Sequence, residues 1–352
     1  MEIKVSESPS EEIVQLLENT IWGMEGGTRY RHCDTRRKIK LLESPYFLSI
    51  ELGNRPVGTG NFCKRYFLTQ GKGIATFYIR YFSIFNGFRR TTKKVNPNKK
   101  GSSKIKAAMQ DIFSHGAFDN PDKKALFYAY VELENERSKT MTEGFGFEAA
   151  RKFSTLVFSR FRPKNTTSVG IATTAEQTEI RKHLETFYSK HTCYEQHPLF
   201  KTGEYFVFRE NGKIVAGLQA TPTHWEIKEI DGLSGKVTML LAPITPIRKI
   251  FNPKNYRFLG IEQSFYLPGY EAKLEPLLSS ACAQLNYNTA MLWADRHSDL
   301  YNALRTNVDF GLLDKLNKEV PADLIVKFTS YTEVEKKPFF ENPAYISAFD
   351  LS

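Results

Sequence analysis

The sequence predicts an α/β fold in which two similar domains, each with a mixed central sheet, follow one another along the chain. Its 352 residues exceed the roughly 100 to 200 residues of a single domain. The content of 41% hydrophobic and 25% charged residues is typical of a packed globular chain. An ungapped internal match at an offset of 159 repeats five identities: Tyr46/Tyr205, Phe47/Phe206, Glu51/Glu210, Gly53/Gly212 and Gly58/Gly217.

The elements around this repeat recur in the same order in both halves. Each copy reads as a β-hairpin preceded by a short strand and by a helix with a capping signal, at residues 8–11 and 174–177. A β-rich run (74–85; 256–267), a helix (103–114; 272–285), a strand (125–133; 289–294) and another short helix follow. The order β-α-β-β-β-α-β-α-β therefore occurs twice, and we expect an N-terminal domain at 1–164 and a C-terminal domain at 165–352.

Charge is concentrated in one segment. Of a formal net charge of +10, residues 86–106 carry eight positive side chains, all between Arg89 and Lys106, and no acid. Such a run attracts polyanions, so a nucleotide, an RNA or plain solvation could each account for it.

Several protein classes are excluded by simple features. The four cysteines form no Cys-x-x-Cys pair, and the seven histidines form no metal-binding spacing, so we expect no disulfide framework and no metal. No apolar run approaches a membrane span, and acidic residues stand where a signal peptide would be apolar. A soluble cytoplasmic protein without a membrane partner is expected.

A candidate phosphate-binding loop precedes the helix predicted at 103–114. Gly101 permits close approach of the backbone to an anion, the helix start presents unpaired N–H groups, and Lys99, Lys100 and Lys104 add positive charge. With this loop the chain resembles the GNAT superfamily of acyl-CoA-dependent N-acyltransferases, with two such domains in tandem. The family's Gln/Arg-x-x-Gly-x-Gly/Ala loop wraps the pyrophosphate of CoA, and Asn98-x-x-Gly101-x-Ser103 is similar to it. The resemblance implies phosphate contacts by Asn98, Lys99, Lys100, Gly101, Ser102, Ser103 and Lys104.

A second segment carries the same resemblance. Asn135-x-x-Ser138, followed by Gly144-Phe145, is similar in spacing to the family's Asn-x-x-Ser/Ala-x-x-x-Tyr helix start. The family fold implies splayed fourth and fifth strands in each domain, with acetyl-CoA or another acyl-CoA held between those of the first. Phe82, Ser83 and Ile84 would then hold the pantetheine arm by their backbone groups, and Asn135 and Ser138 would complete the cofactor site.

Candidate catalytic residues follow from the same positions. Thr142 stands where the family often has a tyrosine that protonates the departing thiolate. Tyr78 and Tyr81 lie on the fourth strand of the first half, which lacks the family's glutamate, and packing is the alternative role for both. Glu262, on the fourth strand of the second half, has the chemistry of a general base for an amine, although it could equally be a surface residue of that strand.

The expected function is therefore an acyl-CoA-dependent N-acyltransferase, with acetyl-CoA as the favoured donor and a small-molecule or peptide amine as the acceptor. Two alternatives remain open. Tandem GNAT proteins include transferases that use aminoacyl-tRNA, for which the cations from Arg89 to Lys106 would bind RNA; we favour the cofactor. A catalytically degenerate GNAT pair that serves as a binding protein is the other.

Overall fold

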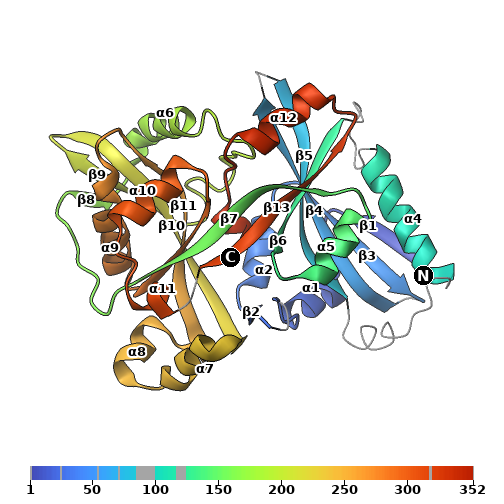
Figure 1. The fold of residues 1–352 in the computed structure, drawn as a ribbon, viewed down its shortest axis with the longest axis horizontal. Helices are drawn as coiled ribbons and strands as arrows, with labels where there is room; N and C mark the ends of the chain where they lie inside the picture. The colour runs from blue at the N-terminus through green and yellow to red at the C-terminus, as the bar shows by residue number, and fades with distance from the viewer. Residues whose placement is uncertain are drawn as a thin grey trace. The chain divides into compact units, whose positions relative to one another are not determined.

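The computed structural model describes residues 2–23, 26–53, 55–69, 72–84, 100–115, 124–316 and 319–351. The chain forms two compact units, each assembled from three segments of sequence. Unit 1 contains residues 1–20, 35–150 and 323–340, and unit 2 contains residues 21–34, 151–322 and 341–352. Each unit is a layered α/β structure around a mixed sheet, which confirms the predicted fold class (Figure 1).

Unit 1 has its strands in the order β1-β3-β4-β5-β6-β13, of which β5 and β6 are parallel. Its strands are β1 (Glu2–Ser6), β3 (Pro45–Leu52), β4 (Arg55–Thr69), β5 (Lys72–Ile84), β6 (Ala125–Glu132) and most of β13 (Val320–Thr329). Its helices are α1 (Glu11–Glu18), α2 (Thr35–Lys40), α4 (Lys100–His115), α5 (Glu136–Glu143) and α12 (Glu333–Glu341). Aromatic side chains of the sheet pack against Met109 and Phe113 of α4 to form the core on one face.

Unit 2 has its strands in the order β7-β12-β11-β10-β9-β8, and β2 pairs with the far end of β10. Its strands are β2 (Thr28–His32), β7 (Glu148–Ser159), β8 (Val169–Ile171), β9 (Glu204–Glu210), β10 (Lys213–Ile230), β11 (Tyr256–Tyr266) and β12 (Thr289–Asp295). Its α-helices are α6 (Gln177–Phe187), α7 (Gly232–Leu241), α8 (Thr245–Ile250), α9 (Leu274–Leu285), α10 (Asp299–Asn307), α11 (Leu312–Leu316) and α13 (Ala348–Leu351). Helices α9 and α10 cover one face of this sheet, and α6 covers the other.

The segments of the two units differ from the single domain boundary expected between residues 164 and 165. Each half of the sequence places its last strand in the opposite unit: residues 151–159 of β7 belong to unit 2, and residues 323–329 of β13 belong to unit 1. Strand β2, from the first half, also joins unit 2 by pairing with β10. Backbone hydrogen bonding to a neighbouring strand decides this membership, and the periodicity of a strand does not specify its neighbour.

The repeated hairpin is present in both units, but its structural offset is 158 instead of 159. The closing pairs are Leu52–Arg55 in unit 1 and Glu210–Lys213 in unit 2. In each hairpin a shift of register leaves one valine of the return strand without a partner in the opposite strand, at Val57 and Val215. The closing pairs and the unpaired valines both give an offset of 158 residues.

The faces of the strands agree with this offset. Leu48 packs with α4 in unit 1, and Phe206, its partner at the offset of 158, packs with α9 in unit 2. Val207, the partner of Leu48 at the offset of 159, faces α6 on the other side of the sheet. Because side chains alternate along a strand, a slip of one residue reverses the face. The identities seen in sequence therefore do not mark equivalent positions.

Residues 85–99 lie outside the described residues. This range holds Arg89, Arg90 and most of the predicted basic segment, and it includes Asn98 and Lys99 of the predicted phosphate loop. The two helix starts predicted at residues 8–11 and 174–177 are displaced in the structure by two residues and one residue, respectively. Ser10 caps α1, and Thr173 forms a capping box with Glu176. Within the described ranges, no helix is long and apolar enough to span a membrane.

Candidate functional site

The fourth strand of each repeat carries a bulge at the same place. In unit 1, Tyr81 has a φ of 54°, and Tyr81 and Phe82 together face Gly60 of β4. In unit 2, Gln263 has a φ of 50°, and residues 263 and 264 face Leu218 of β10. Left-handed φ values are uncommon for residues other than glycine and occur often at functional sites. The bulge withdraws backbone groups from the ladder and bends the strand.

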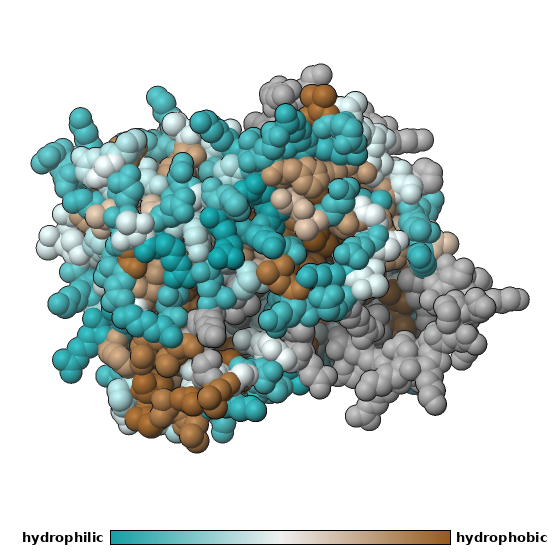
Figure 2. Space-filling view, in the orientation of Figure 1, coloured by the Kyte–Doolittle hydropathy of each residue, from teal (hydrophilic) through white to brown (hydrophobic). Residues whose placement is uncertain are grey.

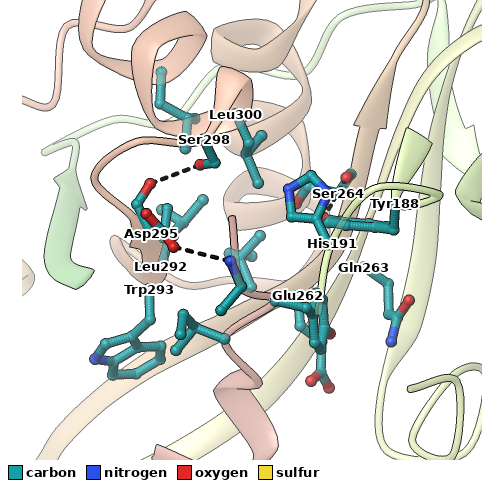
Figure 3. Close-up of a pocket in the computed structure, with 16 residues that line it drawn as sticks. Tyr188, His191, Glu262, Gln263, Ser264, Leu292, Trp293, Asp295, Ser298 and Leu300 are labelled. Carbon is teal, nitrogen blue, oxygen red and sulfur yellow. Dashed lines mark hydrogen bonds between the residues drawn. The ribbon is translucent and has the colours of Figure 1, made fainter. Parts of the chain in front are cut away.

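Parallel pairing ends just before the bulge in both units. Strands β5 and β6 are paired over only three residues, Thr76–Tyr78 with Leu126–Tyr128. Strands β11 and β12 are likewise paired over only three, Leu259–Ile261 with Ala290–Leu292. In unit 2 a pocket lies where β11 and β12 separate, and its walls include residues of both strands (Figure 3).

Glu262 is one of two carboxylates that line this pocket, and it lies on β11 directly before the left-handed residue. It is 3% exposed. Its Oε1 accepts a hydrogen bond from Gln219 Nε2 at 3.2 Å, and its Oε2 accepts from Ser347 Oγ and from the backbone N of Phe349, both at 3.3 Å. Burial raises the pKa of Glu262 to about 7, against the effect of these donors, and the nearby Asp350 also raises it. A carboxylate with this pKa could exchange a proton with a substrate at neutral pH.

The C-terminal segment of the chain closes the same pocket. Ala344 N donates to Asp295 Oδ2 of β12 at 2.8 Å, while Phe349 N at the start of α13 donates to Glu262 of β11. Ala344, Tyr345 and Ile346 line the pocket together with the strands. The space that remains is about 20 Å³, which suits about one water molecule. In this structure the diverging ends of β11 and β12 are thus occupied by the chain itself.

Asp295 and His191 face each other across the pocket (Figure 3). Arg151 holds the Asp295 carboxylate with two hydrogen bonds, from Nε at 2.8 Å and from Nη2 at 3.1 Å, and both side chains are buried. Backbone N–H groups of His297 and Ala344 supply two more donors to Asp295. Burial lowers the pKa of His191 to about 4, so its imidazole is neutral at neutral pH.

In unit 1 the position equivalent to Glu262 is Arg80, the residue directly before the left-handed Tyr81. Its guanidinium lies 4.1 Å from the centre of the Tyr81 ring. Tyr78 packs against Tyr128, with ring centres 5.2 Å apart. Tyr78 and Tyr81 are both buried. These contacts place both predicted catalytic tyrosines inside the packing of unit 1, and their catalytic role remains a prediction.

The residues predicted to hold the pantetheine arm lie at and after the bulge of β5. Phe82 is exposed, Ser83 is buried with its hydroxyl 2.8 Å from that of Thr20, and Ile84 is the last residue of the strand. Of the predicted phosphate loop, the structure describes the part from Lys100, at which α4 begins. Gly101, Ser102, Ser103 and Lys104 therefore lie at the start of α4, where the first N–H groups of a helix have no partner within it.

The predicted signature at residues 135–147 forms α5 and the turn after it. Asn135 caps α5 by accepting a hydrogen bond from Ser138 N at 3.0 Å. The Thr142 hydroxyl donates within its own helix, to Ser138 O at 2.9 Å or Lys139 O at 3.0 Å. These contacts give the side chains of Asn135 and Thr142 a structural role, and the roles of Asn135, Ser138 and Thr142 toward a cofactor remain predictions.

Sequence reasoning missed several residues of the unit 2 pocket. Asp295, His191, Arg151 and Gln219 were not among the predicted site residues. A polar residue next to a strand end was the only available signal. Among the described residues, no cluster of three or more His, Cys, Asp or Glu side chains could hold a metal ion.

Comparison with known proteins supports the fold. No protein-family profile matches the sequence, and no curated protein matches it. Among solved structures, Saccharomyces cerevisiae N-myristoyltransferase with bound myristoyl-CoA is similar over 97% of this chain and 88% of that chain, at 9% identity and a TM-score of 0.56. Another structure of it with myristoyl-CoA matches 97% and 84% of the two chains, at 9% identity and a TM-score of 0.57. The chain thus has a tandem GNAT-like fold.

Proposed function

We propose that this protein is an acyl-CoA-dependent N-acyltransferase in which unit 1 takes the acyl-CoA. The proposal rests on one observation: the strand pair β5 and β6 of unit 1 is equivalent to the pair β11 and β12 of unit 2. Both pairs separate next to a left-handed bulge, and in unit 2 the C-terminal segment bridges the separated ends. Unit 1 is therefore the unit we assign to the cofactor. The similarity in fold to a myristoyl-CoA-bound enzyme supports the choice of ligand class.

The described residues of unit 1 fit such a ligand in two respects. The bulge at Tyr81 and Phe82 frees backbone groups beside the line where β5 leaves β6, and these groups would hold the pantetheine amides. Helix α4 begins at Lys100, so its first turn would hold the phosphates through backbone N–H groups. When bound, acyl-CoA supplies a thioester carbonyl and a thiolate leaving group. The chain would contribute mainly the positioning of the amine and an N–H that polarises the carbonyl.

Unit 2 would then serve the acceptor side or have a structural role. Glu262 has a suitable pKa for a general base, but the C-terminal segment covers it. Acetyl-CoA is the donor we propose to test first, followed by longer acyl chains up to myristoyl-CoA. An acyl-CoA at a hundred times its dissociation constant should stabilise the protein by about 2.7 kcal/mol. A thermal-shift titration with the acyl-CoA series is the direct test, and no shift with any donor would contradict the proposal.

Replacement of Gly101 by valine should weaken acyl-CoA binding by about 1 to 3 kcal/mol. The added side chain would crowd the approach of a phosphate to the first turn of α4, at the cost of charge-assisted hydrogen bonds. Isothermal titration calorimetry measures the change. Ala107→Val, at an exposed position later in the same helix, is the matched control and should bind as the wild type does. Equal affinities for the two variants would remove α4 from the site.

The role of the basic segment separates the cofactor from RNA. Joint replacement of Arg89, Arg90, Lys93 and Lys94 by alanine should leave acyl-CoA affinity almost unchanged, because a pyrophosphate and a ribose phosphate offer only a few contacts. Binding to tRNA would instead involve the whole segment, with a salt slope of about −0.7 to −0.9 per neutralised phosphate. Fluorescence polarisation with tRNA across a salt series tests this. Tight, salt-sensitive binding that the fourfold variant loses would favour the aminoacyl-tRNA alternative.

A further inference from the structure

Within unit 2, helix α7 buries small residues and exposes Leu233, Val237 and Leu240, while its Met239 and Leu241 are half-buried. Gly235, Thr238 and the C-cap Ala242 are the buried positions. A Cβ added at Gly235 would lie 2.5 Å from Ile230 Cγ2 and 2.6 Å from Ile230 O, so the helix approaches the end of β10 too closely for any larger residue. This arrangement is the reverse of an ordinary amphipathic helix, whose large apolar side chains face the core.

The outward face forms an apolar surface that continues past the end of the helix. Leu233 is 83% exposed, Val237 39%, Leu240 76% and Ile244 49%. The first three are spaced at i, i+4 and i+7, and therefore lie on one side of α7. Figure 2 shows a brown, apolar surface at the lower left, where α7 and α8 lie in Figure 1. We call Leu233, Val237, Leu240 and Ile244 the α7 apolar face. Grouped exposure of this kind marks an interaction surface.

Positive charge adjoins the α7 apolar face. Residues 231–255 contain four cations, Lys236, Arg248, Lys249 and Lys254, and a single acid, Asp231. Arg248 follows Ile244 by four residues and donates its backbone N–H to Ile244 O, so the two lie one helical turn apart on α8. Arg248 and Lys249 also line a polar hollow of about 190 Å³, together with Arg257 and four asparagines.

We propose that the α7 apolar face docks on an anionic lipid membrane. The exposed leucines would enter the boundary between headgroups and acyl chains, while the neighbouring cations, including those of the hollow, would contact lipid phosphates. Charge decides between a membrane and a second copy of this chain, because two copies meeting through this face would bring like charges together. The sequence-based expectation of no membrane partner rested on the absence of an apolar run long enough to span a membrane. This face instead arises from the way a ten-residue helix packs.

Vesicle sedimentation with the purified full-length chain tests the proposal. The wild type should bind phosphatidylcholine vesicles that contain phosphatidylserine, should bind pure phosphatidylcholine vesicles much less, and should lose binding as salt rises. L233S combined with L240S should lower the partition coefficient by about tenfold or more, because the two most exposed leucines no longer insert. R248E combined with K249E should lower binding to the anionic vesicles by at least about tenfold.

A matched control uses exposed apolar residues elsewhere. V334S combined with I171S removes side chains that are 79% and 44% exposed and should leave binding unchanged. All variants should keep the wild-type melting temperature, since the positions are exposed. The proposal is overturned if the wild type ignores anionic vesicles, or if the double leucine variant binds as well as the control does. It is also overturned if gel filtration shows a wild-type dimer that the leucine variant dissociates. Acyl-CoA binding is a separate readout that none of these variants should alter.

Discussion

Replacement of Arg151 by methionine is expected to destabilise unit 2 by about 3 to 5 kcal/mol, the cost of removing one partner of a buried ion pair. The Asp295 carboxylate is fully buried and receives two hydrogen bonds from Arg151. Without the guanidinium, the donors that remain to it among the described residues are the backbone N–H groups of His297 and Ala344. Because Ala344 belongs to the C-terminal segment, the loss should also loosen the closure of the pocket.

The measurement is urea denaturation followed by tryptophan fluorescence. All three tryptophans, Trp22, Trp225 and Trp293, belong to unit 2, so the signal follows that unit. Arg209→Met is the matched control, because Arg209 forms a similar two-bond pair with Glu176 in a more exposed place. It should cost about 1 kcal/mol or less. Equal losses for the two variants would show that burial does not set the strength of the Arg151–Asp295 pair.

Glu262 should make unit 2 less stable as the pH rises from about 4.5 to about 7. The ordinary pKa of 4.5 applies to the unfolded chain, and burial raises the folded value to about 7. Below pH 4.5 the carboxyl is protonated in both states, so it carries no penalty. Above pH 7 it is ionised in both, and the folded state bears the full cost of a buried charge, on the order of 3 kcal/mol.

The variant Glu262→Gln isolates this effect. Its stability relative to the wild type should rise across that pH window and stay level outside it. The difference in stability between Glu262→Gln and the wild type is measured because it cancels the contribution of His191, which both proteins contain. The folded-state pKa of His191 is about 4, so this residue makes the fold less stable as the pH falls below 6.5. Glu210→Gln is the control, since Lys273 lowers the pKa of that exposed carboxylate and its slope should have the opposite sign. A flat difference for Glu262→Gln would mean that Glu262 is not desolvated.

Much of the fold could be predicted because the signals are local. The strands at 74–85 and 256–267 and the helix at 272–285 correspond closely to β5, β11 and α9. Runs of apolar and β-branched residues and helix-capping residues specify such elements within a few neighbours in the chain. The α/β class with two similar halves followed from these local signals, the GNAT-like fold was implied by the resemblance of two short motifs, and both are confirmed.

The candidate site was less predictable. Glu262 was identified as a carboxylate on the correct strand, but its environment comes from Ser347 and Phe349, which lie 85 and 87 positions later in the chain. Arg151 and Asp295 are 144 positions apart and meet only because β7 pairs with β12. No spacing in the sequence relates such residues, so the predicted site stopped at single candidates.

The sequence alone determined most of the strands and helices that recur in both halves, and that they occur twice. Tertiary structure decided three further things: which unit each terminal strand joins, the offset of 158 that relates the hairpins, and the burial that sets the pKa of Glu262. The reason is physical. Local periodicity reports the conformation of a segment, whereas strand partners and desolvation depend on contacts between residues far apart in the chain.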